Sequence, residues 1–104
     1  MLKPPEHLRA SGSEFYKSVS DEYAIMDAAG LALLLRAAEC VDRMGAAQSE
    51  ITNNGELIPD RYGGMKLNPA CNLEKDARSG FLAAMRALNL DIEPLRDGPG
   101  RPTN

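Results

Sequence analysis

The sequence predicts a mainly α fold: a three-helix subunit with a long central helix, a small β-hairpin before the last helix and a flexible tail. Three observations predict it. Apolar residues recur at three- and four-residue steps in three segments, a glycine turn at 61–64 separates two short apolar stretches, and residues 96–104 are rich in Gly and Pro. We expect one domain, with an N-terminal arm at 1–10, a helical region at 11–95 that contains a hairpin at about 56–67, and a disordered tail at 96–104.

The first predicted helix covers roughly residues 12–22, because Pro4 and Pro5 prevent an earlier start. Ser11 and Glu14 have the spacing of a capping box, in which each side chain accepts a hydrogen bond from a free backbone N–H group. We expect its aromatic side to pack on the central helix; this side consists of Phe15, Tyr16, Val19 and Tyr23. The arm before this helix is expected to be mobile.

The central helix is predicted from Asp27, its N-cap, to about Asn53. It would be about 40 Å long at about 1.5 Å per residue, which exceeds the roughly 30 Å diameter of a small domain. Its polar stripe is narrow, because apolar residues cover most of its circumference. We therefore predict that part of it contacts another copy of the chain, although an ordinary core helix remains the alternative. The predicted oligomer interface is the row Leu31, Leu34, Ala38 and Val41.

The pair Asn54-Gly55 fits either a two-residue hairpin turn or the left-handed end of the central helix. We adopt the helix end, because Gly63 and Gly64 supply the positive φ angles of a hairpin tip further along. Such a hairpin is marginal alone and usually leans on a helix or on another subunit.

The third helix is predicted to begin at Asn68, as N-cap, with Pro69 in its first position, and to end near Asn89. Its expected inward row is Ala70, Leu73, Ala77, Phe81, Ala84 and Leu88. The segment Gly100-Arg101-Pro102 resembles the core of an AT-hook, but Pro99 occupies the place of the second arginine. We therefore interpret the tail as disordered rather than as a hook.

The composition of the chain predicts what kind of core the protein has and where in the cell it lies. The chain is 5% aromatic and has no Trp, so we expect a core of Ala, Leu and Met. The longest uncharged stretch, residues 28–35, is too short to span a bilayer, and the N-terminus has no apolar signal segment, so we expect a cytoplasmic protein. A formal net charge of −3 argues against a protein that simply coats nucleic acid.

No catalytic or metal-binding set is evident, and we expect a protein that is not an enzyme and has no cofactor. His7 is the only histidine and lies in the arm, where it would not be held as a general base. Cys40 and Cys71 lack the spacing of a zinc site and are expected to be free thiols. Gly63-Gly64 is not followed by the Gly-Lys-Ser/Thr of a phosphate-binding loop.

The order of these features resembles the small subunit of phage terminase, in particular its short helix–hairpin–helix members from tailed phages and prophages. The resemblance covers about 85 of the 104 residues. It rests on six segments: PEHLRASGSEFYKSV, DAAGLALLLRAAECVDR, ITNNG, DRYGG, NPA and RALNLDIEPLR. Two features depart from that family. Phe15-Tyr16 stands where members often have Trp, and residues 89–96 replace a Gly-x-x-Pro-x-x-Arg ending.

The resemblance implies a non-catalytic subunit that forms a ring-like homo-oligomer in the cytoplasm of the host bacterium. It also implies binding to phage double-stranded DNA and regulation of the large terminase subunit, which is an ATPase and nuclease. The alternative is a helical homo-oligomeric adaptor that binds only protein partners, and the acidic pI near 5.1 favours it.

If the protein binds DNA, contacts are expected where the local charge is positive. Residues 1–20 carry a balance of +1, whereas residues 21–50 carry −4. This distribution selects Lys3, Arg9 and Lys17, with Arg101 in the tail as a second site.

Overall fold

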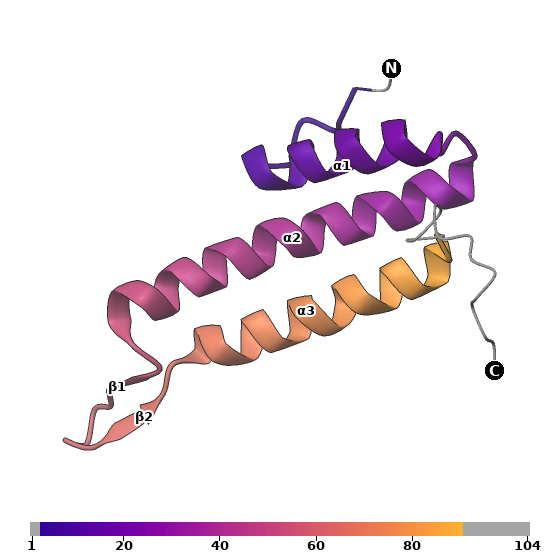
Figure 1. Ribbon diagram of the computed structural model, residues 1–104. Helices are drawn as coiled ribbons and strands as arrows, with labels where there is room; N and C mark the ends of the chain where they lie inside the picture. Colours follow the sequence, from indigo (N-terminus) through magenta and orange to yellow (C-terminus); the bar gives the residue numbers. More distant parts are fainter. Residues whose placement is uncertain (1–2, 91–104) are drawn as a thin grey trace, which may run out of the picture.

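The computed structural model describes residues 3–90, and in that part of the chain it is mainly helical (Figure 1). The elements follow one another as α1 (Ala10–Tyr23), α2 (Ala28–Asn54), β1 (Leu57–Pro59), β2 (Met65–Leu67) and α3 (Pro69–Leu88). The predicted order of a helix, a long central helix, a small two-stranded hairpin and a last helix is confirmed. The predicted tail and Arg101 lie outside the described residues.

Helix α2 is the element on which the others pack. Helices α1 and α3 flank it and each runs antiparallel to it, while the hairpin extends from the end of α2 that lies beyond α1 (Figure 1). Phe15 of α1 also meets Phe81 of α3 edge to face, with ring centroids 5.6 Å apart. Such pairs stabilise by about 0.5–1.5 kcal/mol beyond the area they bury, so this contact ties the two outer helices together. No helix within residues 3–90 has the length and apolar character needed to cross a membrane.

The core between α1 and α2 includes residues that were predicted on the oligomer interface. Leu34 and Ala38 are both 0% exposed and pack with Tyr16 and with Leu8 of the arm. They contact α1 of their own chain and have no surface to offer a second copy, so their assignment to the interface is wrong for this packing. The amphipathic α1 buries this side of α2 within one chain. Leu31 and Val41 are half-buried.

Helices α2 and α3 approach each other through small side chains. The buried residues of this contact are Ala37, Cys40, Ala47, Ala70, Ala77 and Ala84. A Cβ atom at Gly80 would lie 3.1 Å from the Sγ atom of Cys40, which shows how close the helices are. Leu73 belongs to the predicted inward row of α3 but is 61% exposed, because it lies at the edge of this narrow contact.

The N-termini of α2 and α3 are capped as the sequence predicts: Asp27 accepts a hydrogen bond from the N–H of Gly30, and Asn68 accepts one from the N–H of Ala70. Helix α2 ends at Asn54, but Gly55 has φ 93° and ψ 162°, so its predicted left-handed conformation is wrong and only the positive φ holds. Helix α3 ends at Leu88, and its C-cap Asn89 adopts the predicted left-handed conformation with φ 54°.

The hairpin pairs Leu57 with Leu67, Ile58 with Lys66 and Pro59 with Met65 in antiparallel register. Its turn is held by Asp60, whose carboxylate accepts hydrogen bonds from the N–H groups of Tyr62 and Gly64 at 2.8 and 2.9 Å. Gly63 has the predicted positive φ, 89°, at the tip, whereas Gly64 does not have a positive φ.

Candidate functional site

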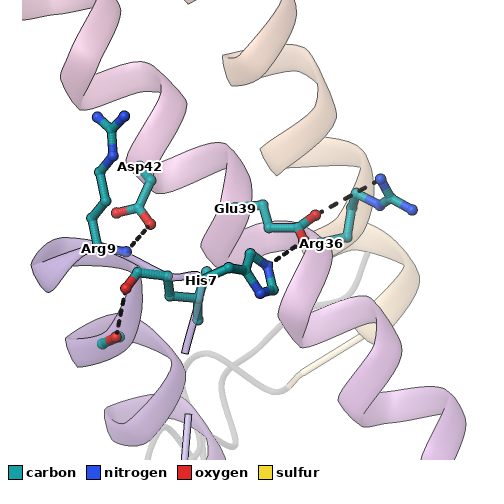
Figure 2. A network of polar contacts seen from close by, with 7 residues as sticks. His7, Arg9, Arg36, Glu39 and Asp42 are labelled. Atoms are coloured by element: carbon teal, nitrogen blue, oxygen red, sulfur yellow. Dashed lines mark hydrogen bonds and ion pairs between the residues drawn. The ribbon is translucent and has the colours of Figure 1, made fainter. Parts of the chain in front are cut away.

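The N-terminal arm is anchored on α2, which corrects the expectation of a mobile arm. Leu8 is buried in the core between α1 and α2. The Nε2 atom of His7 lies 2.8 Å from a carboxylate oxygen of Glu39, and the guanidinium of Arg36 lies 3.9 Å from the other oxygen (Figure 2). The arm therefore covers part of the polar stripe of α2, and His7 has a fixed position on it.

A carboxylate from α2 replaces the predicted capping box of α1. The helix begins at Ala10 with Arg9 as N-cap, no side chain of its own segment caps it, and the Ser11–Glu14 box is therefore wrong. Instead, Asp42 accepts hydrogen bonds from the N–H groups of Arg9 and Gly12, both at 2.7 Å. Figure 2 shows the bond from Arg9. A negative charge at this end also interacts favourably with the helix dipole.

The three basic residues predicted to contact DNA that lie in the described part of the chain are exposed: Lys3, Arg9 and Lys17. Within residues 3–90, none of them forms an ion pair. Their surroundings are mixed, since α1 carries Glu14, Asp21 and Glu22 against Lys17 alone. The predicted contacts are thus accessible, but α1 as a whole is an acidic helix.

An open apolar groove lies between α2 and α3; we call it the α2–α3 groove. It encloses about 540 Å³. Its lining consists of Arg36, Cys40, Arg43, Ala46, Ala47, Glu50, Ala70, Leu73, Asp76, Ala77 and Gly80. The floor is made of small apolar residues, and the four charged residues form the rim. The sequence did not predict this groove, because the alanines on both helices have the spacing of ordinary residues in a helix–helix contact.

The hairpin is a second exposed surface. Leu57 and Pro59 alternate with Ile58 along β1, so they share one face with their partners Leu67 and Met65. Three large side chains of this apolar face are about half exposed or more: Leu57, Met65 and Leu67. At the tip, Tyr62 is 84% exposed, and the guanidinium of Arg61 lies 5.8 Å from the centre of its ring.

The described side chains offer little for metal chemistry. In the part of the chain from residue 3 to residue 90, no three His, Cys, Asp or Glu side chains gather closely enough to hold a metal ion. Cys40 is buried and Cys71 is half-buried, and both are free thiols. The two apolar surfaces, rather than a polar cleft, are the features suited to function.

Comparison with known proteins identifies no relative: no protein family, no curated protein and no solved structure matches the chain. Exposed apolar surfaces such as the α2–α3 groove and the hairpin face are typical of places where proteins contact other macromolecules.

Proposed function

We propose that this protein is the non-catalytic small subunit of a viral DNA-packaging terminase. In this role it binds phage double-stranded DNA, assembles into a ring-like homo-oligomer and regulates the large ATPase and nuclease subunit. The observation that supports the proposal most is the order of sequence features: the arm and first helix PEHLRASGSEFYKSV, a long acid-capped helix, the DRYGG turn and the NPA helix start follow one another in the order that the family resemblance implies.

Assembly would allow an acidic subunit to bind DNA. The chain carries 15 acidic residues against 12 Lys and Arg, so one copy would bind DNA weakly. A ring repeats the same contacts around its circumference. A duplex that touches several copies binds more tightly than to one copy, because after the first contact forms the others act at a high effective concentration. The half-buried Glu39 and Asp42 are already engaged by the arm and by α1, and Arg9 beside them is exposed.

The test is a titration of the purified chain with duplex DNA at several salt concentrations. A DNA-binding assembly loses affinity steeply as salt rises, with a log–log slope of about −0.9 for each phosphate contact. In a second assay, the chain is added to its cognate large subunit, and the rate of ATP hydrolysis is expected to change. No detectable DNA binding at low salt, together with an unchanged ATPase rate, would refute the proposal.

A helical adaptor that binds only protein is the second candidate. The acidic surface of α1 and the apolar face of the hairpin favour it, because neither is suited to a polyanion. The two assays separate the candidates. An adaptor leaves DNA unshifted at every salt concentration, while it still changes the behaviour of its protein partner.

A further inference from the structure

The backbone hydrogen bonds of the hairpin show which of its groups face outward. The N–H of Asn68 donates to the carbonyl of Glu56 at 2.7 Å, and the N–H of Asp60 donates to that of Gly64 at 2.9 Å. Hydrogen-bonded and non-hydrogen-bonded pairs alternate along an antiparallel ladder. Two pairs between these bonds therefore direct their backbone groups away from the hairpin: Leu57 with Leu67, and Pro59 with Met65.

Strand β2 has the outer edge that can pair with another strand. Met65 and Leu67 each direct an N–H and a C=O group outward, and all three residues of β2 are exposed. On the outer edge of β1, Pro59 has no N–H group to donate. A two-stranded hairpin is marginally stable in water, and a third strand beside an apolar face stabilises it. The edge of β2 is therefore the place where an extended segment would add.

The side chains along this edge favour a partner with an alternating sequence. Met65 and Leu67 share the exposed apolar face, whereas Lys66 lies on the opposite face of the hairpin and is exposed. A strand fits here when its apolar residues lie beside Met65 and Leu67 and an acidic residue lies beside Lys66. The chain contains such a stretch directly after the described residues, Asp91-Ile92-Glu93-Pro94-Leu95, in which acidic and apolar residues alternate.

The hairpin of the same chain is too far away for this segment. Helix α3 separates the two and is about 30 Å long, at about 1.5 Å for each of its 20 residues. Leu90 packs against the core just after α3 ends, and the chain from there to Pro94 extends about 14 Å at most. Figure 1 shows the hairpin and the end of α3 at opposite ends of the molecule. Residues 91–95 can therefore pair only with the hairpin of a second copy.

We propose that residues 91–95 of one copy add to β2 of a second copy as a third strand, parallel to β2. The register pairs Met65 with Ile92, Lys66 with Glu93 and Leu67 with Pro94. Parallel pairing uses the N–H groups of Glu93 and Leu95 and leaves the nitrogen of Pro94 facing solvent, where no hydrogen bond is lost. Antiparallel pairing of the same apolar residues would require an N–H group from Pro94, which has none.

The contact is head-to-tail, because the added segment and the edge that receives it lie at opposite ends of each copy. Each copy donates one strand and accepts another, and head-to-tail contacts form a ring when the rotation between copies closes. The proposal names the contact for the self-association in the proposed function, and in that respect it rests on the proposed function. In strand addition, main-chain hydrogen bonds supply the affinity and alternate side chains supply the specificity.

The experiment exchanges the charges of Lys66 and Glu93 in the full chain. Lys66→Glu and Glu93→Lys each place like charges side by side in every contact, so each is expected to associate about threefold or more weakly than the parent. The double variant restores opposite charges in every contact and is expected to recover the association of the parent. Light scattering coupled to size exclusion, over a range of concentrations, compares the mass with the 11.2 kDa of one chain. Lys75→Glu, an exposed reversal on α3, is the matched control and is expected to keep the mass of the parent.

Two variants of Leu95 test the backbone pairing separately from the charges. Leu95→Pro removes the N–H group that would donate to the carbonyl of Leu67, and it is expected to weaken association by about fivefold. Leu95→Ala keeps this N–H group and is expected to associate nearly as strongly as the parent. A chain that ends after Leu90 lacks the added strand and is expected to be monomeric at concentrations where the parent assembles. A chain that ends after Asp97 keeps the strand and is expected to assemble.

Three results would overturn the added strand. They are a parent chain of monomer mass at micromolar concentration, a chain ending after Leu90 that assembles like the parent, and a double charge variant that associates no better than the single variants. Single variants that associate as strongly as the parent would equally exclude this register. The DNA titration and the ATPase assay test the proposed function independently. A chain that assembles without the added strand and still binds DNA would refute this contact and leave the proposed function in place.

Discussion

The carboxylate of Asp42 accepts a hydrogen bond of 2.7 Å from the backbone N–H of Gly12, and this contact connects the start of α1 to the middle of α2. Its second oxygen accepts from the N–H of Arg9, so one side chain satisfies two of the N–H groups that a helix leaves free at its N-terminus. The contact spans 30 residues of sequence. It fixes the position of α1 along α2 and, with it, the path of the arm.

Replacing Asp42 by Ala is expected to destabilise the protein by about 2 kcal/mol, because two backbone donors lose a charged acceptor. Asp42→Asn keeps one carbonyl oxygen and is expected to lose about half as much. Urea denaturation followed by circular dichroism measures both. The control is Asp27→Ala, which removes an exposed cap of α2 and should lower the free energy of unfolding by about 1 kcal/mol. An effect of Asp42→Ala no larger than that of the control would contradict the bridging role.

Two glycines in helices should respond to alanine with opposite signs. A Cβ atom at Gly12 would lie 2.8 Å from the carbonyl oxygen of Ala38 and would also clash with the Asp42 carboxylate. Because the backbone of α2 cannot move aside cheaply, Gly12→Ala is expected to lower the free energy of unfolding by roughly 1–3 kcal/mol. Gly45→Ala meets nothing within 4 Å and is expected to raise it by about 0.5–1 kcal/mol. Equal effects in the same denaturation assay would exclude a close approach at Gly12.

Local signals in the sequence predicted the helices and the hairpin well, but they did not predict which helix faces meet or which stay open. Asp27 and Asn68 accept hydrogen bonds from backbone N–H groups two or three residues away, and the N–H of Gly55 bonds to Ile51, so the places where the helices begin and end could be found from spacing alone. Asp42 and Gly12 act across the interface between two helices, and sequence spacing does not reveal which face meets which. The glycine at position 12, inside an otherwise good helix pattern, was the one available signal of a close contact.

The prediction of an oligomer interface failed at Leu34 and Ala38 for a related reason. The apolar row that contains Leu34 and Ala38 could be covered either by another copy or by a helix of the same chain, and hydrophobic periodicity is the same in both cases. In the structure, α1 covers it. The α2–α3 groove, which is left open, is lined by alanines and glycine, whose weak hydrophobic signal does not separate a tight helix contact from an exposed groove.

Leu34→Ala tests whether Leu34 belongs to the core of one chain rather than to an interface between copies. Because Leu34 is 0% exposed within one chain, its truncation is expected to lower the free energy of unfolding by about 2–5 kcal/mol. The loss should be the same at every protein concentration, since the cavity forms inside the subunit. Urea unfolding at several protein concentrations gives the comparison. A loss that grows with protein concentration would return Leu34 to an interface between copies.

The last prediction concerns which cations contact DNA, and it compares two double variants in the same salt titration. Arg9→Ala with Lys17→Ala removes two of the three exposed cations of the N-terminal region, and Arg61→Ala with Lys66→Ala removes those of the hairpin. If the N-terminal cations contact phosphates, the first variant should flatten the slope of log affinity against log salt by nearly two units for each subunit on the duplex, since each lost contact contributes about 0.9. The hairpin variant should then keep the slope of the parent.

We expect the N-terminal pair to matter more, because the apolar hairpin face would lie unfavourably against a polyanion. Lys75→Ala with Arg86→Ala serves as the control, since it removes the same charge from the exposed side of α3. The control corrects for the change in net charge, which alters affinity without removing a contact. A slope that flattens only in the hairpin variant would move the DNA contact to Arg61 and Lys66, and equal flattening in all three variants would mean that the measured binding reports net charge alone.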